Sequence, residues 1–364
     1  MRLRQGKIGI AEGCAVCVIS LFVNGVFALD PGTAYEGGNS AYLSVPLSVL
    51  LSLMLAAFAL LAMERAGEGS LDSLIGRSFG RIPGALLSVI LALSFVLSAA
   101  KPLEGFVEVL HRLVYDGVSY TSILLFLFPA IVVIAWKGFE SIGRIALIFF
   151  GLIFVSAAVA VISASPEFSS DRLFPLPSTE SFLGLTRYEG LYLLTPSAAL
   201  LVNSRGLGGV GTTRRILAIS SVTAALVIGL TQLALALIYP YRVLSGILMP
   251  LYRINFLSLS QSYLLRLDKL FIMIWLAGCA ISSAYLIYSA ALLTSRSFGA
   301  KDVTPAVLTL SFVLCALVFI GFEKEYAAVV KLGELTGRWG FLLPALPLAL
   351  VSLTGIIKKR KIEL

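Results

Sequence analysis

Residues 304–322 read TPAVLTLSFVLCALVFIGF and contain no charged side chain. A helix needs about 20 predominantly apolar residues to cross the hydrocarbon core of a bilayer. Comparable apolar stretches of roughly 18–25 residues recur along the whole chain. A membrane β-barrel would instead show segments of about ten residues that alternate in polarity. The sequence therefore predicts an all-α polytopic membrane protein.

The overall composition supports this prediction. Of 364 residues, 58% are hydrophobic and 13% are charged, and the mean hydropathy is +0.96. Soluble domains carry roughly 25% charged residues, and a soluble core of this size cannot bury so many apolar side chains. The net charge of +8 does not indicate nucleic-acid binding, because Lys and Arg sit at the ends of apolar stretches and in the tail 358–361. That placement is typical of a membrane orientation signal that also attracts anionic lipid.

About ten transmembrane helices are expected within a single transmembrane domain, 1–364. Most Lys and Arg residues fall on one side if the spans alternate with both termini in the cytoplasm, which favours this orientation of a multi-pass protein. Four longer connections separate some spans. Segments 64–83 and 101–117 are expected to be amphipathic or loop pieces, 165–183 is Pro/Ser-rich and irregular, and 240–267 is expected to form a surface helix. The expected spans are 8–29, 41–63, 84–100, 119–136, 144–164, 186–203, 216–239, 268–294, 304–322 and 339–357.

Two spans at matching positions carry residues that disturb helices. Span 1 contains Asn24-Gly25, and span 6 contains Thr195-Pro196-Ser197. Proline removes a backbone donor and clashes with the preceding turn, so an interruption is expected at Pro196. Breaks in spans 1 and 6 are typical of a five-plus-five inverted-repeat transporter fold, with repeats at about 8–164 and 186–357. In the alternative interpretation, Pro196 is a tolerated kink and Gly25 a packing contact.

The ends of interrupted helices can bind charged groups of a ligand. Half-helix N-termini present partial positive charge to an anion, and C-terminal ends present carbonyl groups to a cation. An amino-acid zwitterion suits such a pair of helix ends. The hydroxyl groups of Ser94, Ser98, Ser282 and Ser283 either line a polar path or bond back to their own helices.

Other motifs point away from enzymes and cofactors. Cys14 and Cys17 lie in an apolar span, where cysteine behaves as a small hydrophobic residue. His111 has no Cys, Asp or His partner at metal-ligand spacing, so no metal site is expected. The GLGGVG of residues 206–211 follows a membrane span rather than the strand of a dinucleotide-binding unit, so no cofactor is expected. No Ser/His/Asp or Cys/His set supports catalysis.

One stretch closely resembles a known family. Residues 249–278, MPLYRINFLSLSQSYLLRLDKLFIMIWLAG, resemble the spore germination permeases, which are the B subunits of Ger-type germinant receptors. The resemblance extends along nearly the whole chain. Its motifs are Pro250-Leu251, Leu267-Asp268 and Ile274-Trp275, the run Lys137-Gly138-Phe139-Glu140 followed by Arg144, and, less specifically, residues 173–177.

The resemblance implies membership of the amino acid–polyamine–organocation transporter superfamily, with ten spans in the inverted five-plus-five fold. It also implies recognition of a small nutrient, often an amino acid, between spans 1, 3, 6 and 8. Expected partners are an A-type membrane subunit and a C-type lipoprotein in the inner membrane of a spore. Carried onto this chain, the substrate site comprises Asn24, Gly25, Phe27, Ser94, Ser98, Tyr192, Thr195, Ser197, Ser282 and Ser283.

The chain departs from the family pattern in ways that affect ligand identity more than fold. Ser282 stands about where many relatives carry a lysine, Glu12 where a glutamine is usual, and Tyr42 where a tryptophan is usual. Three functions remain open at this stage. The chain is a germinant-receptor subunit that binds a nutrient and signals, an amino-acid permease or symporter of the same fold, or a membrane scaffold without a ligand.

Overall fold

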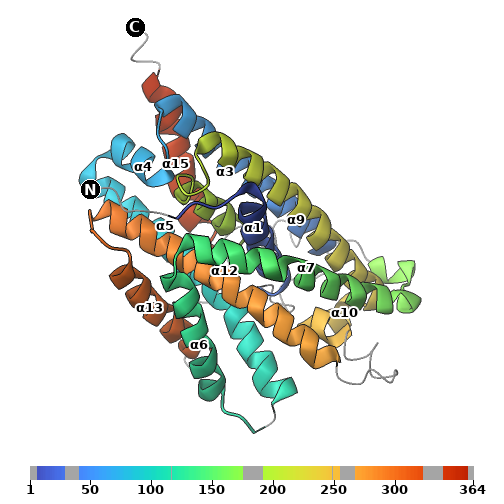
Figure 1. Cartoon of the computed structure of the whole chain (residues 1–364). Helices are drawn as coiled ribbons and strands as arrows, with labels where there is room; N and C mark the ends of the chain where they lie inside the picture. The colour runs from blue at the N-terminus through green and yellow to red at the C-terminus, as the bar shows by residue number, and fades with distance from the viewer. Residues whose placement is uncertain are drawn as a thin grey trace.

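The computed structural model describes residues 6–28, 41–115, 117–174, 192–247, 249–254, 267–322 and 339–359. Within these ranges all regular structure is helical, and the helices pack side by side in one elongated bundle (Figure 1). Six of the described helices are long and apolar enough to span a membrane by length and composition. They are α3 (Ala41–Ala66), α5 (Arg81–Val109), α7 (Phe139–Ser163), α9 (Val210–Ile238), α12 (Leu267–Ser297) and α13 (Thr304–Phe322).

Four shorter apolar helices complete the set: α1 (Ile10–Val26), α6 (Tyr120–Trp136), the helix Tyr192–Val202, and α15 (Leu342–Lys359). Each of the ten expected spans coincides with one of these ten described helices. The prediction of an all-α polytopic membrane protein is therefore confirmed.

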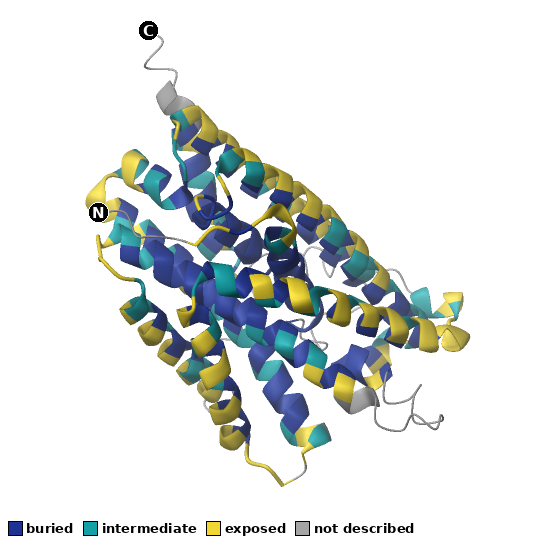
Figure 2. Ribbon diagram, in the orientation of Figure 1, coloured by how far each residue is buried: buried dark blue, intermediate teal, exposed yellow. Residues whose placement is uncertain are grey.

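α1 lies in the middle of the bundle. Every residue from Ala15 to Val26 is buried, and the helix packs against α9, α7 and α12. Figure 2 shows the same division, with buried residues inside and exposed ones on the outer faces of the helices. Large apolar side chains such as Met54, Ile148 and Phe312 are exposed on α3, α7 and α13. Because water does not favour such faces, we assign them to lipid.

Helix boundaries follow from local chemistry. The Ser119 hydroxyl accepts a hydrogen bond from the Ser122 N–H (3.2 Å) at the start of α6. Asp302 accepts one from the Thr304 N–H (3.1 Å) at the start of α13. Both satisfy N–H groups that the first turn leaves without a helical partner. Between α6 and α7, Gly138 has φ +87°, a conformation that favours glycine and allows the tight turn.

The segment 101–117 differs from expectation. α5 continues to Val109 and then through the π-helical turn η1 (Leu110–Val114), so most of this segment is helical. Its charges are paired along the helix, Lys101 with Glu104 (3.5 Å) and Glu108 with Arg112 (3.1 Å), which stabilises the helix surface. With 29 residues, α5 is about 44 Å long, so its ends extend past a hydrocarbon core of about 30 Å.

The other three connections are described in part or in full. Segment 64–83 contains α4 (Leu71–Phe79), an amphipathic helix with Leu71, Leu74 and Ile75 buried, as expected. The Pro/Ser-rich segment forms two 3-10 turns, η2 (Ser165–Glu167) and η3 (Ser170–Leu173), and residues 175–183 lie outside the described ranges. The expected surface helix is represented by α10 (Tyr241–Leu244) and residues 250–254; positions 255–266 are outside the description.

Neither expected interruption lies where the sequence placed it. α1 continues regularly through Asn24-Gly25 to Val26, and the Phe27 N–H closes the last turn on the Val23 carbonyl (2.9 Å). The helix Tyr192–Val202 continues through Pro196. The expected break at Pro196 is corrected here to a helix that passes through it. The neighbouring segments 29–40 and 175–191 lie outside the described residues.

Candidate functional site

The amide of Asn24 joins three helices in the interior of the bundle. Its Nδ2 donates to the Ser20 carbonyl (2.8 Å) and to the Ser282 hydroxyl on α12 (3.4 Å). Its Oδ1 accepts from the Ser98 hydroxyl on α5 (3.0 Å). Asn24 is 2% exposed. Since a buried amide is costly without partners, these bonds fix α1 against α5 and α12.

A fourth helix enters through Thr195. Its hydroxyl donates to the Ser98 hydroxyl (2.6 Å) and also lies 3.2 Å from the Tyr192 carbonyl. That carbonyl lacks its usual helical donor because Pro196, four residues later, has no N–H. The hydroxyls of Thr195 (3.2 Å) and Ser98 (3.5 Å) both lie within reach of this carbonyl, as an alternative to the bonds that they donate to Ser98 and Asn24. Nearby hydroxyl groups of this kind help a membrane helix to tolerate proline.

We call this arrangement the polar cluster. Its members come from four helices that are far apart in sequence, and all are buried. The hydroxyls of Ser20 and Ser282 complete it with a hydrogen bond of 2.9 Å. The members are Ser20, Asn24, Ser98, Thr195 and Ser282.

Three further side chains bond backbone carbonyls beside the polar cluster. Gln232 on α9 donates to the Gly25 carbonyl (3.2 Å), Ser283 to the Ala99 carbonyl (3.3 Å), and Tyr285 to the Pro196 carbonyl (3.1 Å). Sequence reasoning missed Ser20 and Gln232. Two signals were available, because Ser20 lies one helical turn before Asn24 on the same face and Gln232 is an amide within an apolar span.

Some of the expected site residues are placed apart from the polar cluster. The Ser94 hydroxyl donates to the Leu91 carbonyl of its own helix (2.7 Å). The buried Ser197 hydroxyl has no hydrogen-bond partner among the described residues. A Cβ added at Gly25 would lie 2.9 Å from Ile228 Cδ1, so this glycine serves the close packing of α1 and α9. That geometry favours the packing interpretation of Gly25.

Aromatic side chains pack next to the end of α1. The Phe27 ring meets those of Phe106 (centroids 4.8 Å apart), Trp275 (5.7 Å) and Phe22 (5.8 Å). Trp275 is fully buried, and its Nε1 donates to the Ser156 hydroxyl on α7 (2.8 Å). Tyr192 packs with Ala28 and Leu97, while its carbonyl bonds to the cluster. The expected residues Phe27 and Tyr192 therefore form an apolar border beside the polar cluster.

The members of the polar cluster are all neutral, with four hydroxyl groups and one amide. Hydroxyls and amides both donate and accept hydrogen bonds, so they can exchange their mutual bonds for bonds to a small polar guest. Such a guest must replace each bond that it displaces, because an unpaired buried donor or acceptor costs about 1–3 kcal/mol. For metal binding, no group of three His, Cys, Asp or Glu side chains gathers in the described ranges.

Comparison with known families decides the identity of the chain. The family model described as "Spore germination protein" matches residues 8–327. The chain belongs to the spore germination protein family.

Two solved structures share the fold of this spore germination protein. One is a Na+-coupled sialic acid symporter in a substrate-bound, outward-open state, with a TM-score of 0.69 and 12% identity; the match covers 98% of this chain and 90% of that one. The other is the manganese transporter of Eremococcus coleocola, with a TM-score of 0.57 and 15% identity, covering 95% and 76%. At these identities the likeness shows a shared transporter fold. No curated protein matches the chain by sequence.

The motifs that suggested this family have structural roles in the spore germination protein. Trp275 anchors α12 to α7 through Ser156, as described above. Phe139 begins α7 and stacks on Tyr288 and Tyr285 of α12, with centroids 6.1 and 6.3 Å apart. Glu140 and Arg144 form an ion pair along one face of α7. The Trp275 and Phe139 contacts fix α7 against α12, the helix that supplies Ser282.

Proposed function

We propose that the protein binds a small polar nutrient, an amino acid, at the polar cluster and signals germination through partner subunits. The observation that carries the proposal is the cluster itself. Five hydrogen-bonding side chains from four helices meet in the interior of a transporter fold. A ligand there contacts four helices at once, and so its binding energy acts on their relative positions.

The surroundings of the cluster suit a zwitterion. α1 ends at Val26, next to the cluster, and the carbonyl end of a helix carries partial negative charge that favours an ammonium group. The described part of the Tyr192 helix begins beside Ala28, and a helix start at this place would offer N–H groups to a carboxylate. The neutral hydroxyls and the amide then bind the remaining polar groups of the nutrient.

The signalling part of the proposal follows from family membership. We propose an A-type membrane subunit and a C-type lipoprotein as partners, in the inner membrane of the spore, with both termini cytoplasmic. The placement of Lys and Arg supports that orientation. We also propose a non-catalytic role and two inverted repeats, for which the shared transporter fold is the support.

A second candidate function is transport of an amino acid, alone or coupled to an ion. The likeness in fold to a Na+-coupled symporter and a manganese transporter favours it. Transport requires that the cluster open to each side of the membrane in turn, whereas sensing requires a response only on binding. The two functions share the binding site and differ in net movement of the ligand.

The test uses the purified protein in lipid nanodiscs and a thermal-shift screen against amino acids, sugars and nucleosides. A ligand of the folded state raises the melting temperature by mass action. The matched variants are Ser98→Ala, which removes a member of the polar cluster, and Ser94→Ala, one turn earlier on the same helix. We expect Ser98→Ala to weaken binding by about tenfold, because one hydrogen bond is worth roughly 0.5–1.5 kcal/mol, and Ser94→Ala to leave it unchanged.

Equal affinities in the two variants would show that the cluster is not the site. Uptake of a radiolabelled ligand into proteoliposomes by the isolated protein would favour the permease over a pure sensor. A third test separates a membrane scaffold without a ligand from both ligand-binding functions. Under that alternative, Thr195→Leu leaves germination and uptake normal when the variant folds to the wild-type level, whereas either ligand-binding function predicts their loss. Gly25→Leu does not discriminate, because a side chain at Gly25 would meet Ile228 whatever the function.

A further inference from the structure

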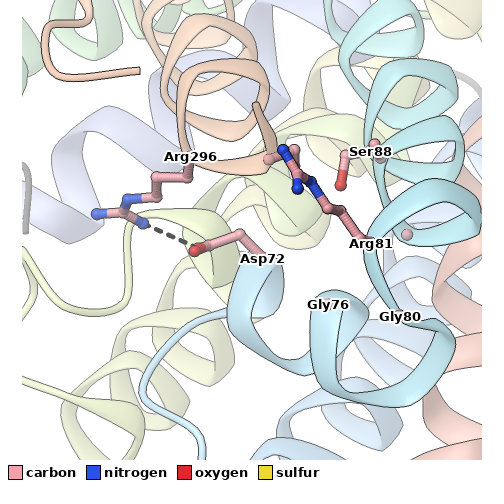
Figure 3. A pocket seen from close by; sticks show the side chains of 9 residues that line it. Asp72, Gly76, Gly80, Arg81, Ser88 and Arg296 are labelled. Atoms are coloured by element: carbon pink, nitrogen blue, oxygen red, sulfur yellow. Dashed lines mark hydrogen bonds and ion pairs between the residues drawn. The ribbon is translucent and has the colours of Figure 1, made fainter. Parts of the chain in front are cut away.

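A second polar site lies where α4, α5 and α12 meet, at the end of the bundle that carries α4. Here the structure forms a partly open cavity of about 120 Å³. That volume is several times what one buried water needs, roughly 10–15 Å³ by this type of measure. Figure 3 shows the labelled side chains around it. The lining residues that matter below are Asp72, Gly80, Arg81, Ser88 and Arg296.

The cavity carries surplus positive charge. Arg296 Nη1 donates to Asp72 Oδ1 (2.9 Å) and to the Val202 carbonyl (3.2 Å), and the two side chains are only 10% and 9% exposed. One guanidinium is thereby matched by one carboxylate. Arg81, an exposed residue, lines the same cavity and is absent from the ion pairs of the described ranges. The three charged side chains thus sum to one net positive charge.

The hydroxyl of Ser88 is an independent sign that something polar binds here. Ser88 is 1% exposed, lines the cavity, and has no hydrogen-bond partner among the described residues. In Figure 3 its oxygen points toward the space that the Arg81 side chain also enters. An unpaired buried hydroxyl costs about 1–3 kcal/mol, which a hydrogen bond to a bound group would offset.

The backbone at the cavity favours an anion. α5 begins at Arg81 with Gly80 before it, and the first N–H groups of a helix carry partial positive charge. A Cβ added at Gly76 or Gly80 would meet no atom within 4 Å, so at both positions the backbone borders open space. Two arginines, a hydroxyl and a helix start form a donor set suited to the oxygens of a phosphate group.

An apolar surface adjoins the cavity. Ile82 and Leu86 on the outward side of α5 are 82% and 62% exposed, and Val89 and Leu93 continue this exposed line along the helix. In a membrane protein such a line contacts acyl chains. A free phosphate would use the cavity alone, whereas a phospholipid uses the cavity and the apolar line together. Basic pockets between helices at a membrane surface are known to hold anionic headgroups.

We propose that the cavity between α4, α5 and α12 binds the phosphate of an anionic phospholipid, held by Arg81, Ser88 and Arg296, with its acyl chain along Ile82 and Leu86. The lipid supplies the negative charge that the described side chains of the cavity lack. It also connects α4 with the end of α12, the helix that contributes Ser282 to the polar cluster.

The experiment measures the melting temperature of the delipidated full chain in a neutral detergent. The probes are phosphatidylglycerol, phosphatidylcholine with the same acyl chains, and inorganic phosphate. We expect phosphatidylglycerol to raise the melting temperature, and the other two to have little effect. Arg81→Gln and Ser88→Ala should each lower the apparent affinity for phosphatidylglycerol by about tenfold, since a hydrogen bond to a charged group is worth about 1.5–3 kcal/mol.

The matched control is Arg215→Gln. Arg215 is exposed near the start of α9, and its neighbour Arg214 pairs with Glu64 of α3, so the control removes an equal charge at the same end of the bundle. It should bind phosphatidylglycerol as the wild type does. Equal stabilisation by phosphatidylglycerol and phosphatidylcholine would overturn the proposal. So would equal stabilisation by inorganic phosphate, which indicates a soluble oxyanion site, or unchanged affinity in both Arg81→Gln and Ser88→Ala.

Discussion

The polar cluster and the cavity between α4, α5 and α12 differ in how their polar groups are balanced. Both contain buried polar groups, although Arg81 of the cavity is exposed. The five side chains of the polar cluster are neutral and bond one another, so the cluster closes without a ligand. The cavity contains two guanidinium groups, one carboxylate and an unpaired hydroxyl. Its charge is not balanced within the described part of the chain.

The difference teaches how each region would select a ligand. A neutral network offers directional donors and acceptors, so it distinguishes ligands by the pattern of hydrogen bonds that replaces its own. A charged cavity distinguishes them first by the sign of their charge, because charge interactions in a region of low dielectric exceed those of neutral dipoles. The first suits a varied nutrient, and the second suits a constant component of the membrane.

The largest effect is expected at the cavity. Asp72→Asn leaves the Arg296 guanidinium without its carboxylate, and breaking a buried ion pair in this way costs about 3 kcal/mol of stability. Reversible unfolding in mixed micelles measures the loss. The double variant Asp72→Asn with Arg296→Gln should recover most of it, because no unpaired charge remains. If the single variant is as stable as the wild type, the contrast between charged and neutral regions is wrong.

A smaller effect is expected in the polar cluster. Asn24→Ala removes the amide that bonds Ser98 and Ser282, and leaving buried hydroxyls unpaired costs about 1–3 kcal/mol. The same unfolding assay applies, with nutrient binding as a second readout. Unlike the effect of Asp72→Asn, the difference in stability between this variant and the wild type should change little with added salt or anionic lipid, since no charge changes. A marked dependence on either would show that the cluster is not electrostatically neutral.

A still smaller effect comes from the packing beside the cluster. Gly25→Ala places a Cβ 2.9 Å from Ile228 Cδ1, the end of a flexible side chain, and such overpacking costs about 1 kcal/mol or more. Ile228→Val should relieve part of it. Gly151→Ala on α7 is the control, because its Cβ meets nothing within 4 Å. It should be neutral or stabilising by up to about 1 kcal/mol. Equal melting temperatures in the two alanine variants would contradict the packing interpretation.

The smallest effect on stability is expected from the exposed carboxylate of Asp302. Asp302 is exposed before α13, and the hydrogen bond from the Thr304 N–H lowers the pKa of its carboxyl below the ordinary 3.8. Because the pKa is lower in the folded state, its contribution to stability is present above pH 3.8 and is lost as the pH falls through the lowered pKa. Asp302→Ala should therefore lower the melting temperature slightly at neutral pH, and the gap should close in acid. A gap that stays constant with pH would show that ionisation of Asp302 has no part in the effect.

Hydropathy along the chain was sufficient to predict an all-α membrane protein and the positions of ten apolar helices, because the length and polarity of each stretch are local properties. The resemblance to the spore germination permeases, rather than hydropathy, supplied many residues of the polar cluster. Asn24, Ser98, Thr195 and Ser282 were all expected at one site, and the structure brings their side chains together. The expected break at Pro196 shows what local sequence could not predict. Proline predicts a break from its own chemistry, but the hydroxyl groups within reach of the Tyr192 carbonyl include that of Ser98, on another helix.

The ion pair in the cavity also could not be predicted from local sequence. Asp72 and Arg296 are 224 residues apart, and nothing local connects them. Whether a charge is paired, or a serine such as Ser94 or Ser88 bonds its own helix or none, depends on which groups the packing of helices brings within about 3 Å. The hydropathy of a segment predicts whether it lies in lipid or in water. The partners of each polar atom follow from the way in which the helices pack.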